Sequence, residues 1–128
     1  MDMLTSNSML MMERSLQFLW TKQSCILDNL SNVETPGYKT KYATFEESLE
    51  NAIRSSVQKN GSTAQVRNAI LDARIETHEA DNESTRMDDN GVNVTEQMVE
   101  LVRNGYQQQY VMRAISSDFS VLMTAIRG

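Results

Sequence analysis

The chain has 128 residues and a net charge of −5, with 12 lysines and arginines against 17 aspartates and glutamates. This length allows one domain, and the mildly acidic balance argues against a nucleic-acid partner. A single cysteine excludes an internal disulfide or a cysteine-rich metal site, and no stretch reaches the ~18 apolar residues of a membrane span.

The first predicted element is a long helix over residues 1–33. Apolar residues recur there at alternating steps of three and four, an average period of 3.5 that is typical of a seam packed against another helix. Gln23 is a polar break in this stripe, and Val33 ends it. The predicted interaction residues of the stripe are Met9, Met12, Leu16, Leu19, Ile26 and Leu30.

The same helix is apolar on more than one face. Trp20 and Leu27 flank the seam, and only five charged residues fall within 1–33. A further row lies away from the seam: Met11, Phe18 and Cys25. Because a helix that is apolar on several faces needs burial on several faces, we expect its outer faces to meet other subunits. Cys25 itself is interpreted as a small buried hydrophobic residue.

A well-marked turn is expected to end the first helix. Proline disfavours helical backbone in the residue before it, and a Pro-Gly pair suits the central positions of a type II turn. An extended stretch then leaves the helix. The predicted turn signature is Asn32, Thr35, Pro36, Gly37 and Tyr38.

The middle segment, residues 34–90, is predicted to be short and irregular. Thr44 and Glu47 form a capping-box pattern that predicts a short helix, whose apolar face is Phe45, Leu49 and Ile53.

The remainder of the middle segment is less regular. Residues 65–77 fit a helix through Val66, Ala69, Ile70 and Ala73, whereas 73–77 also fit a strand, and both alternatives stay open. The polar residues 78–91 are predicted to form a mobile loop.

Residues 91–128 are predicted to form the second long helix. Its stripe includes Val94, Gly105 and Gln108, and its predicted interaction residues are Met98, Leu101, Met112, Ile115, Phe119, Leu122 and Ile126. The predicted fold class is therefore all-α, with an antiparallel, coiled-coil-like pair of long terminal helices. Facing residue numbers should sum to about 127, since one chain leaves at Val33 and returns at Val94. This register places Gln23 beside Gly105, Leu19 near Gln108 and Leu30 near Met98.

No catalytic, cofactor-binding or metal-binding residues are predicted. A calcium loop with Gly91 at its sixth position would have Arg86 and Gln97 at its anchoring positions, where acidic ligands are required. His78 has no cysteine or second histidine with which to share a metal, and is interpreted as a solvated loop residue. Because the apolar helix faces exceed what one chain can bury, folding coupled to assembly is expected.

Two segments carry a family resemblance. Residues 28–39, DNLSNVETPGYK, resemble the signature that ends the first helix of bacterial flagellar rod and hook proteins, with mild departures at Asp28, Ser31 and Glu34. Residues 90–98 and 119–128 resemble the start and the terminus of the last helix of proximal rod proteins, with departures at Asn93 and Met123. Residues 45–88 have no secure match.

The resemblance implies a structural subunit of the proximal rod of the flagellar basal body, located in the periplasm. Such subunits are exported by the flagellar type III apparatus without a cleaved signal and polymerise into the axial drive shaft. The implied partners are other copies of the chain, neighbouring rod proteins, the rod-to-membrane-ring adaptor and, transiently, the export gate. No nucleic-acid partner and no membrane insertion are expected.

Phe45 and Leu49 fit the spacing of the export-gate motif of rod subunits, although simple packing on an amphipathic helix explains the same pair. A helical adaptor or export-chaperone module is the alternative function, since an apolar helix can also serve as a binding groove. An enzyme is the third hypothesis.

Overall fold

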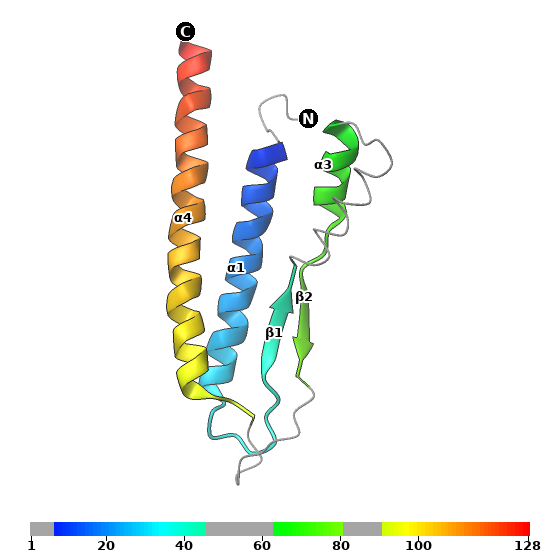
Figure 1. Cartoon of the computed structure of the whole chain (residues 1–128), viewed down its shortest axis with the longest axis vertical. Helices are drawn as coiled ribbons and strands as arrows, with labels where there is room; N and C mark the ends of the chain where they lie inside the picture. Colours follow the sequence, from blue (N-terminus) through cyan, green and yellow to red (C-terminus); the bar gives the residue numbers. More distant parts are fainter. Residues whose placement is uncertain (1–6, 46–62, 81–90) are drawn as a thin grey trace.

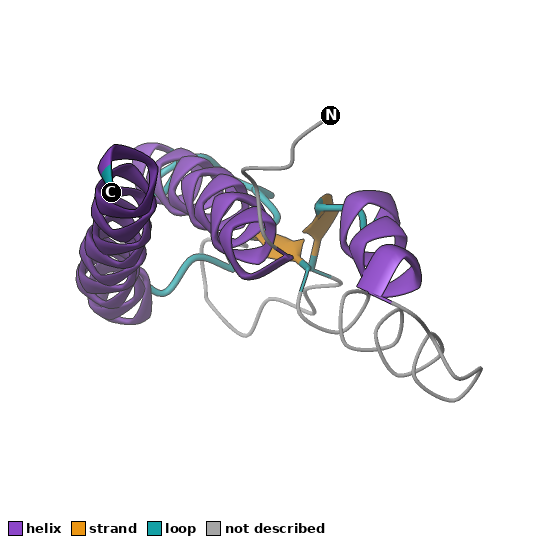
Figure 2. Cartoon of the chain, turned by 90° about the horizontal axis from the view of Figure 1, so that it is seen from above, coloured by secondary structure: helices purple, strands orange, loops and turns teal. Residues whose placement is uncertain are grey.

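A computed structural model describes residues 7–45, 63–80 and 91–128 of the chain. In chain order the elements are α1 (Asn7–Ser31), β1 (Lys41–Thr44), α3 (Thr63–Asp72), β2 (Glu76–Glu79) and α4 (Val94–Arg127). α1 lies between α4 on one side and the strands and α3 on the other (Figures 1 and 2). The long terminal helices around a short middle confirm the predicted fold class, and a small two-stranded sheet is added to it.

α1 is covered on two faces because it carries two apolar rows. One row, which includes Leu19 and Ile26, is buried towards α4, and the other includes Phe18 and Cys25. The Phe18 ring stacks on Phe45 with the ring centroids 5.6 Å apart. The expectation that the row of Phe18 and Cys25 meets other subunits is therefore wrong, because the chain's own middle segment covers it.

The main core cluster joins α1 to the middle segment: Leu10, Phe18, Leu19, Phe45, Ile70 and Ala73. Arg14 of α1 adds a polar clamp, since its guanidinium donates a hydrogen bond to the Ala73 carbonyl and lies 5.8 Å from the centre of the Phe45 ring. Such an arrangement combines a hydrogen bond to a charged donor with a cation–π contact. It fixes the end of α3 against α1.

The two strands pair antiparallel, with Tyr42 opposite His78 and Thr44 opposite Glu76. The helix and strand alternatives for residues 65–77 both hold in part, because α3 ends at Asp72 and β2 begins at Glu76. The predicted loop over residues 78–91 begins too early, because residues 78 and 79 belong to β2. His78 lies in β2, where its Nε2 is 2.9 Å from Thr44 Oγ1 and its ring lies 5.2 Å from that of Tyr42.

Part of the predicted middle segment lies outside the described residues. These predictions are the short helix through Leu49 and Ile53 and the loop over residues 81–90. Thr44, the predicted cap of that helix, lies in β1. Among the described residues, no helix is long and apolar enough to cross a membrane.

The turn after α1 has the predicted form. Gly37 has a φ of 72°, and the Tyr38 amide donates to the Thr35 carbonyl across the Pro36-Gly37 pair at 3.3 Å. Only glycine adopts a positive φ without steric cost. The side chain of Asn32 stabilises the turn by donating to the Asp28 carbonyl and accepting from Thr35 Oγ1.

Replacing Gly37 with valine is expected to destabilise the folded chain by about 1 to 3 kcal/mol, because a β-branched residue is strained at positive φ. The measurement is urea unfolding followed by helical circular dichroism. Gly37→Asn is the matched control, since asparagine tolerates this region better. Equal stability of the valine variant and the parent chain would contradict the turn assignment.

Candidate assembly interface

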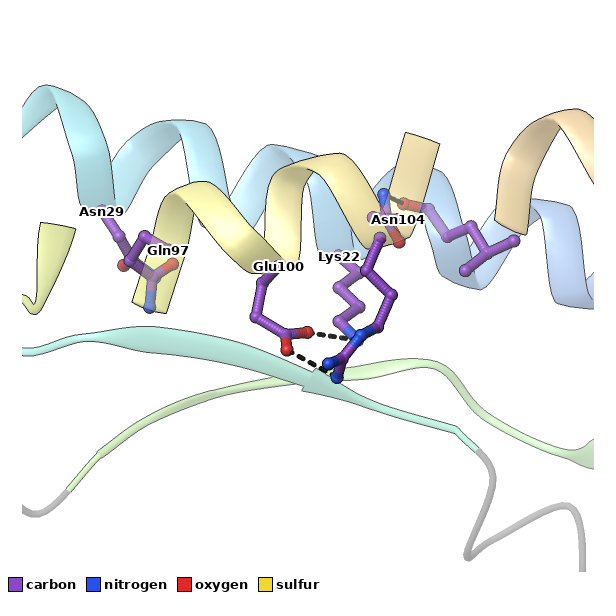
Figure 3. Close-up of polar contacts among 7 residues, drawn as sticks. Lys22, Asn29, Gln97, Glu100 and Asn104 are labelled. Atoms are coloured by element: carbon purple, nitrogen blue, oxygen red, sulfur yellow. Dashed lines mark hydrogen bonds and ion pairs between the residues drawn. The ribbon is translucent and has the colours of Figure 1, made fainter. Parts of the chain in front are cut away.

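The contact between α1 and α4 is strongly polar near Asn29. This side chain is 1% exposed. Its amide donates to the Lys41 carbonyl at 2.9 Å and to Gln97 Oε1 at 3.0 Å, and its Oδ1 accepts from the Lys41 amide at 2.8 Å and from the Tyr38 hydroxyl at 3.4 Å (Figure 3 shows the approach to Gln97). One buried side chain thus joins α1, the strand after the turn and α4.

Two further polar contacts continue along the same seam. Asn104, fully buried in α4, donates from Nδ2 to the Leu19 carbonyl at 2.9 Å (Figure 3). Gln108 donates to the amide oxygen of Gln23 at 2.7 Å. Within the described part of the chain, Asn104 Oδ1 is buried and has no hydrogen-bond partner, which carries a desolvation cost.

An ion pair lies beside these contacts. Lys22 Nζ is 3.2 Å from Glu100 Oε2, and Arg103 donates to Glu100 Oε1 at 2.9 Å (Figure 3). Both carboxylate oxygens of Glu100 are therefore used. Polar groups at a helix seam fix register at a cost in stability, so this seam specifies the pairing more than it stabilises the chain.

The helix direction was predicted correctly, and the register only approximately. The contacts of Asn29 with Gln97, Leu19 with Asn104, and Gln23 with Gln108 run antiparallel, with residue numbers that sum to 126, 123 and 131. The pairing of Gln23 with Gly105 is wrong, because the amide oxygen of Gln23 accepts a hydrogen bond from Gln108. An added Cβ at Gly105 would meet no heavy atom of the described chain within 4 Å, so this glycine makes no room for Gln23.

The row of α4 that faces α1 is shifted from the predicted stripe. The observed row follows helical spacing through Gln97, Asn104 and Val111, with Leu101, Gln108 and Ile115 half-buried beside it. Four of the seven predicted interaction residues have other surroundings. Leu122 is half-buried, and Met98, Met112, Phe119 and Ile126 are exposed.

The predicted stripe of α1 is better buried. Leu19 and Ile26 are buried, and Met9, Met12, Leu16 and Leu30 are half-buried. Of the predicted export-gate pair, Phe45 is 3% exposed, and Leu49 lies outside the described residues. Apolar side chains from the first helix therefore meet a mixed row on the second, which contains Gln97, Asn104 and Gln108 as well as Leu101, Val111 and Ile115.

The outward surface of α4 is correspondingly apolar. Four exposed apolar residues follow helical spacing along α4, and two of them, Tyr106 and Tyr110, are 70% and 76% exposed. We call this row the ridge: Val99, Val102, Tyr106 and Tyr110. Burial of such residues is favourable at about 25 cal/mol per Å² of apolar surface. The ridge therefore favours contact with another molecule.

Two hollows adjoin the ridge. One, of about 540 Å³, lies between α1 and α4, and its apolar lining includes Phe18, Phe45, Tyr110 and Val111. The other, of about 610 Å³, is lined by Met98, Val99, Val102, Arg103, Tyr106 and Gln107. Of these lining side chains only Arg103 is charged, and Glu100 accepts its hydrogen bond. Both hollows suit apolar side chains of a partner.

The sequence contains a pattern that indicates Asn29 and Asn104, but the prediction followed the apolar stripes and did not use it. Gln97 and Asn104 are seven residues apart, immediately beside the apolar stripe of α4, and Gln108 lies in the stripe itself. Asn29 falls three residues before the turn, where an amide can reach the returning strand. Neither residue was predicted, because a search for apolar repeats does not score buried amides.

The titratable groups of the described chain show no reactive centre. Burial raises the pKa of the Cys25 thiol, and a hydrogen bond with Thr77 offsets part of this effect. Burial likewise raises the pKa of Tyr38. Among the described residues there is no group of three metal-ligating side chains. The features that stand out are therefore the polar seam and the outward apolar surface.

Comparison with known proteins points to one family, because the two similar proteins below carry the same name. No protein-family model matches the chain. A flagellar basal body rod protein FlgB from Borrelia hermsii is 33% identical over 100 residues, which cover 71% of the chain and 74% of that protein. A protein of the same name from Bacillus subtilis (strain 168) is 25% identical over 117 residues, covering 91% of each.

Proposed function

Because the chain belongs to the family of flagellar basal body rod proteins named FlgB, we propose that it is a structural subunit of the proximal part of that rod. The role is assembly rather than catalysis. Each copy contributes its paired terminal helices to the wall of the shaft, and its partners are other copies and the neighbouring rod proteins.

The observation that carries this proposal is the distribution of polar and apolar side chains on α4. Asn104 and Gln97 face inward to α1, whereas Val102, Tyr106 and Tyr110 are exposed. A free-standing helical hairpin normally keeps its large apolar residues in the seam and polar residues on its exposed faces. An outward apolar surface supports a subunit that gains most of its stability on assembly.

The remaining steps of the proposal follow from the family resemblance. The chain is exported by the flagellar type III apparatus without a cleaved signal, polymerises in the periplasm and contacts the rod-to-membrane-ring adaptor. Phe45 is buried against Phe18 once the chain is folded. Phe45 is therefore available to the export gate only before folding.

The test is a deletion strain complemented with the parent chain, with basal bodies purified and probed by an antibody against the chain. We expect the deletion strain to be non-motile, the complemented strain to swim, and the chain to copurify with the rod. The alternative of an adaptor or export chaperone predicts a soluble complex of fixed size. Absence of the chain from basal bodies of motile cells would overturn the proposed function.

A further inference from the structure

The beginning of α4 is attached to the rest of the chain by three neighbouring contacts. The hydroxyl of Thr40 donates to the Gly91 carbonyl at 3.2 Å, and Val92, the next residue, is fully buried. The amide of Asn29 then donates to Gln97 Oε1 at 3.0 Å (Figure 3). We call this attachment the joint: Asn29, Thr40, Gly91, Val92 and Gln97.

The two donors of the joint are themselves held in place. Asn29 is almost fully buried, and its short side chain bonds both the amide and the carbonyl of Lys41, at 2.8 and 2.9 Å. The carbonyl of Thr40 accepts from the Ala80 amide at 2.8 Å. Because hydrogen bonds are directional, a donor fixed in this way also fixes the group that accepts from it. α4 therefore starts from a defined place at the end of α1.

The contacts further along α4 are more adaptable. The pairs of Lys22 with Glu100 and Gln23 with Gln108 join long side chains that are half-buried, and such side chains follow a moving partner by changing rotamer. Asn104 makes one hydrogen bond to α1. Within the described part of the chain, the last side-chain hydrogen bond from α4 to another element is that of Gln108. The far half of α4 therefore contributes little to its own direction.

The length of α4 amplifies any change at the joint. At 1.5 Å per residue, the helix from Gln97 to Arg127 is about 45 Å long, so a rotation of about 10° at Gln97 moves Arg127 by about 8 Å. The exposed apolar residues, including Tyr106 and Tyr110, lie along this lever. Their position in space thus depends on the joint.

We propose that Gln97, held by Asn29, is the positioning residue that sets the direction of α4 relative to α1. The inference rests on the proposed function, since a regular shaft requires every copy to present α4 in the same direction. It assigns to the turn region after α1 the task of orienting the other terminal helix.

The first test measures the direction of α4 in the free full-length chain. Spin labels are attached at two exposed positions, Ser24→Cys on α1 and Ser117→Cys on α4, in a chain with Cys25→Ser. Pulsed electron paramagnetic resonance gives the distribution of distances between them. We expect Gln97→Leu to shift or broaden this distribution by about 5 Å, as a rotation of about 10° does at this distance along the helix. Equal distributions in the parent chain and Gln97→Leu would overturn the inference.

Two matched variants separate the hydrogen bond from the substitution. Gln97→Glu keeps an oxygen that accepts from Asn29, so its distribution should match the parent chain. Gln109→Leu makes the same change at an exposed position of α4 and should also match. Helical circular dichroism checks that all variants are folded to the same extent. A distribution in Gln97→Glu or Gln109→Leu like that of Gln97→Leu would overturn the inference.

The second test measures the consequence for assembly. Loss of one hydrogen bond lowers the population of the correct direction by about tenfold, so we expect about tenfold less Gln97→Leu than parent chain in basal bodies. Gln97→Glu and Gln109→Leu should be incorporated normally, and normal incorporation of Gln97→Leu would overturn the inference. Absence of the parent chain from basal bodies would instead reject the proposed function, and the distances in the free chain would still decide the role of Gln97.

Discussion

The Phe18→Ala chain is expected to lose about 3 to 5 kcal/mol of unfolding free energy, the range for removal of a buried phenylalanine ring. Phe18 is 9% exposed and stacks on Phe45 within the cluster that joins α1 to the middle segment. Its loss leaves a cavity beside Ile70 and Ala73, which belong to the same cluster. The measurement is urea unfolding of the purified chain, monitored by circular dichroism.

Trp20→Ala is the control for this prediction, because Trp20 lies on the same helix but is half exposed. Its expected effect on the isolated chain is below about 1 kcal/mol, as for most surface changes. Trp20→Ala should therefore fold as the parent chain does. Equal losses of stability in the two variants would contradict the assigned core.

Replacing Asn29 with leucine is expected to cost about 2 to 4 kcal/mol, although the two side chains are similar in size. Asn29 makes four hydrogen bonds while almost fully buried. Without it, the amide and carbonyl of Lys41 and the amide of Gln97 lose their partners. An unsatisfied buried polar group typically costs about 1 to 3 kcal/mol.

Asn104→Leu is the matched comparison. Asn104 is equally buried but makes one hydrogen bond, to the Leu19 carbonyl, and its own oxygen is unsatisfied within the described chain. Its replacement should therefore change stability by less than about 1 kcal/mol or increase it, because an unsatisfied buried group is removed. The two variants are compared in the same urea titration. A larger loss for Asn104→Leu than for Asn29→Leu would contradict this account of the seam.

The helix pair was predictable from sequence because its signal is local and repeated. A stripe of period 3.5 sustained over several turns indicates a helix with a packed face, and the Pro36-Gly37 pair indicates the turn. Which row of α4 faces α1 was not predictable in the same way. The apolar row with Met98 and the polar row with Gln97 have the same period and differ by one residue, so spacing alone does not choose between them.

The two strands were harder to predict for a different reason. Each is four residues long, and Tyr42 pairs with His78 across 36 residues of sequence. Short strands gain stability from their partners rather than from their own pattern. His78 was therefore interpreted as solvated from its polar neighbours, whereas its hydrogen bond with Thr44 arises only in the paired state.

The exposed apolar face of α4 is expected to become covered when the subunit assembles. Three single-cysteine chains test it, each with Cys25→Ser: Tyr106→Cys on the ridge, Asn104→Cys in the seam and Asn68→Cys on α3. Maleimide labelling rates are measured in the free chain and in purified basal bodies. In the free chain we expect fast labelling at positions 106 and 68 and slow labelling at position 104. In basal bodies, labelling at position 106 should become as slow as at position 104, while position 68 stays fast. An unchanged rate at position 106 would show that this face of α4 stays uncovered in the rod.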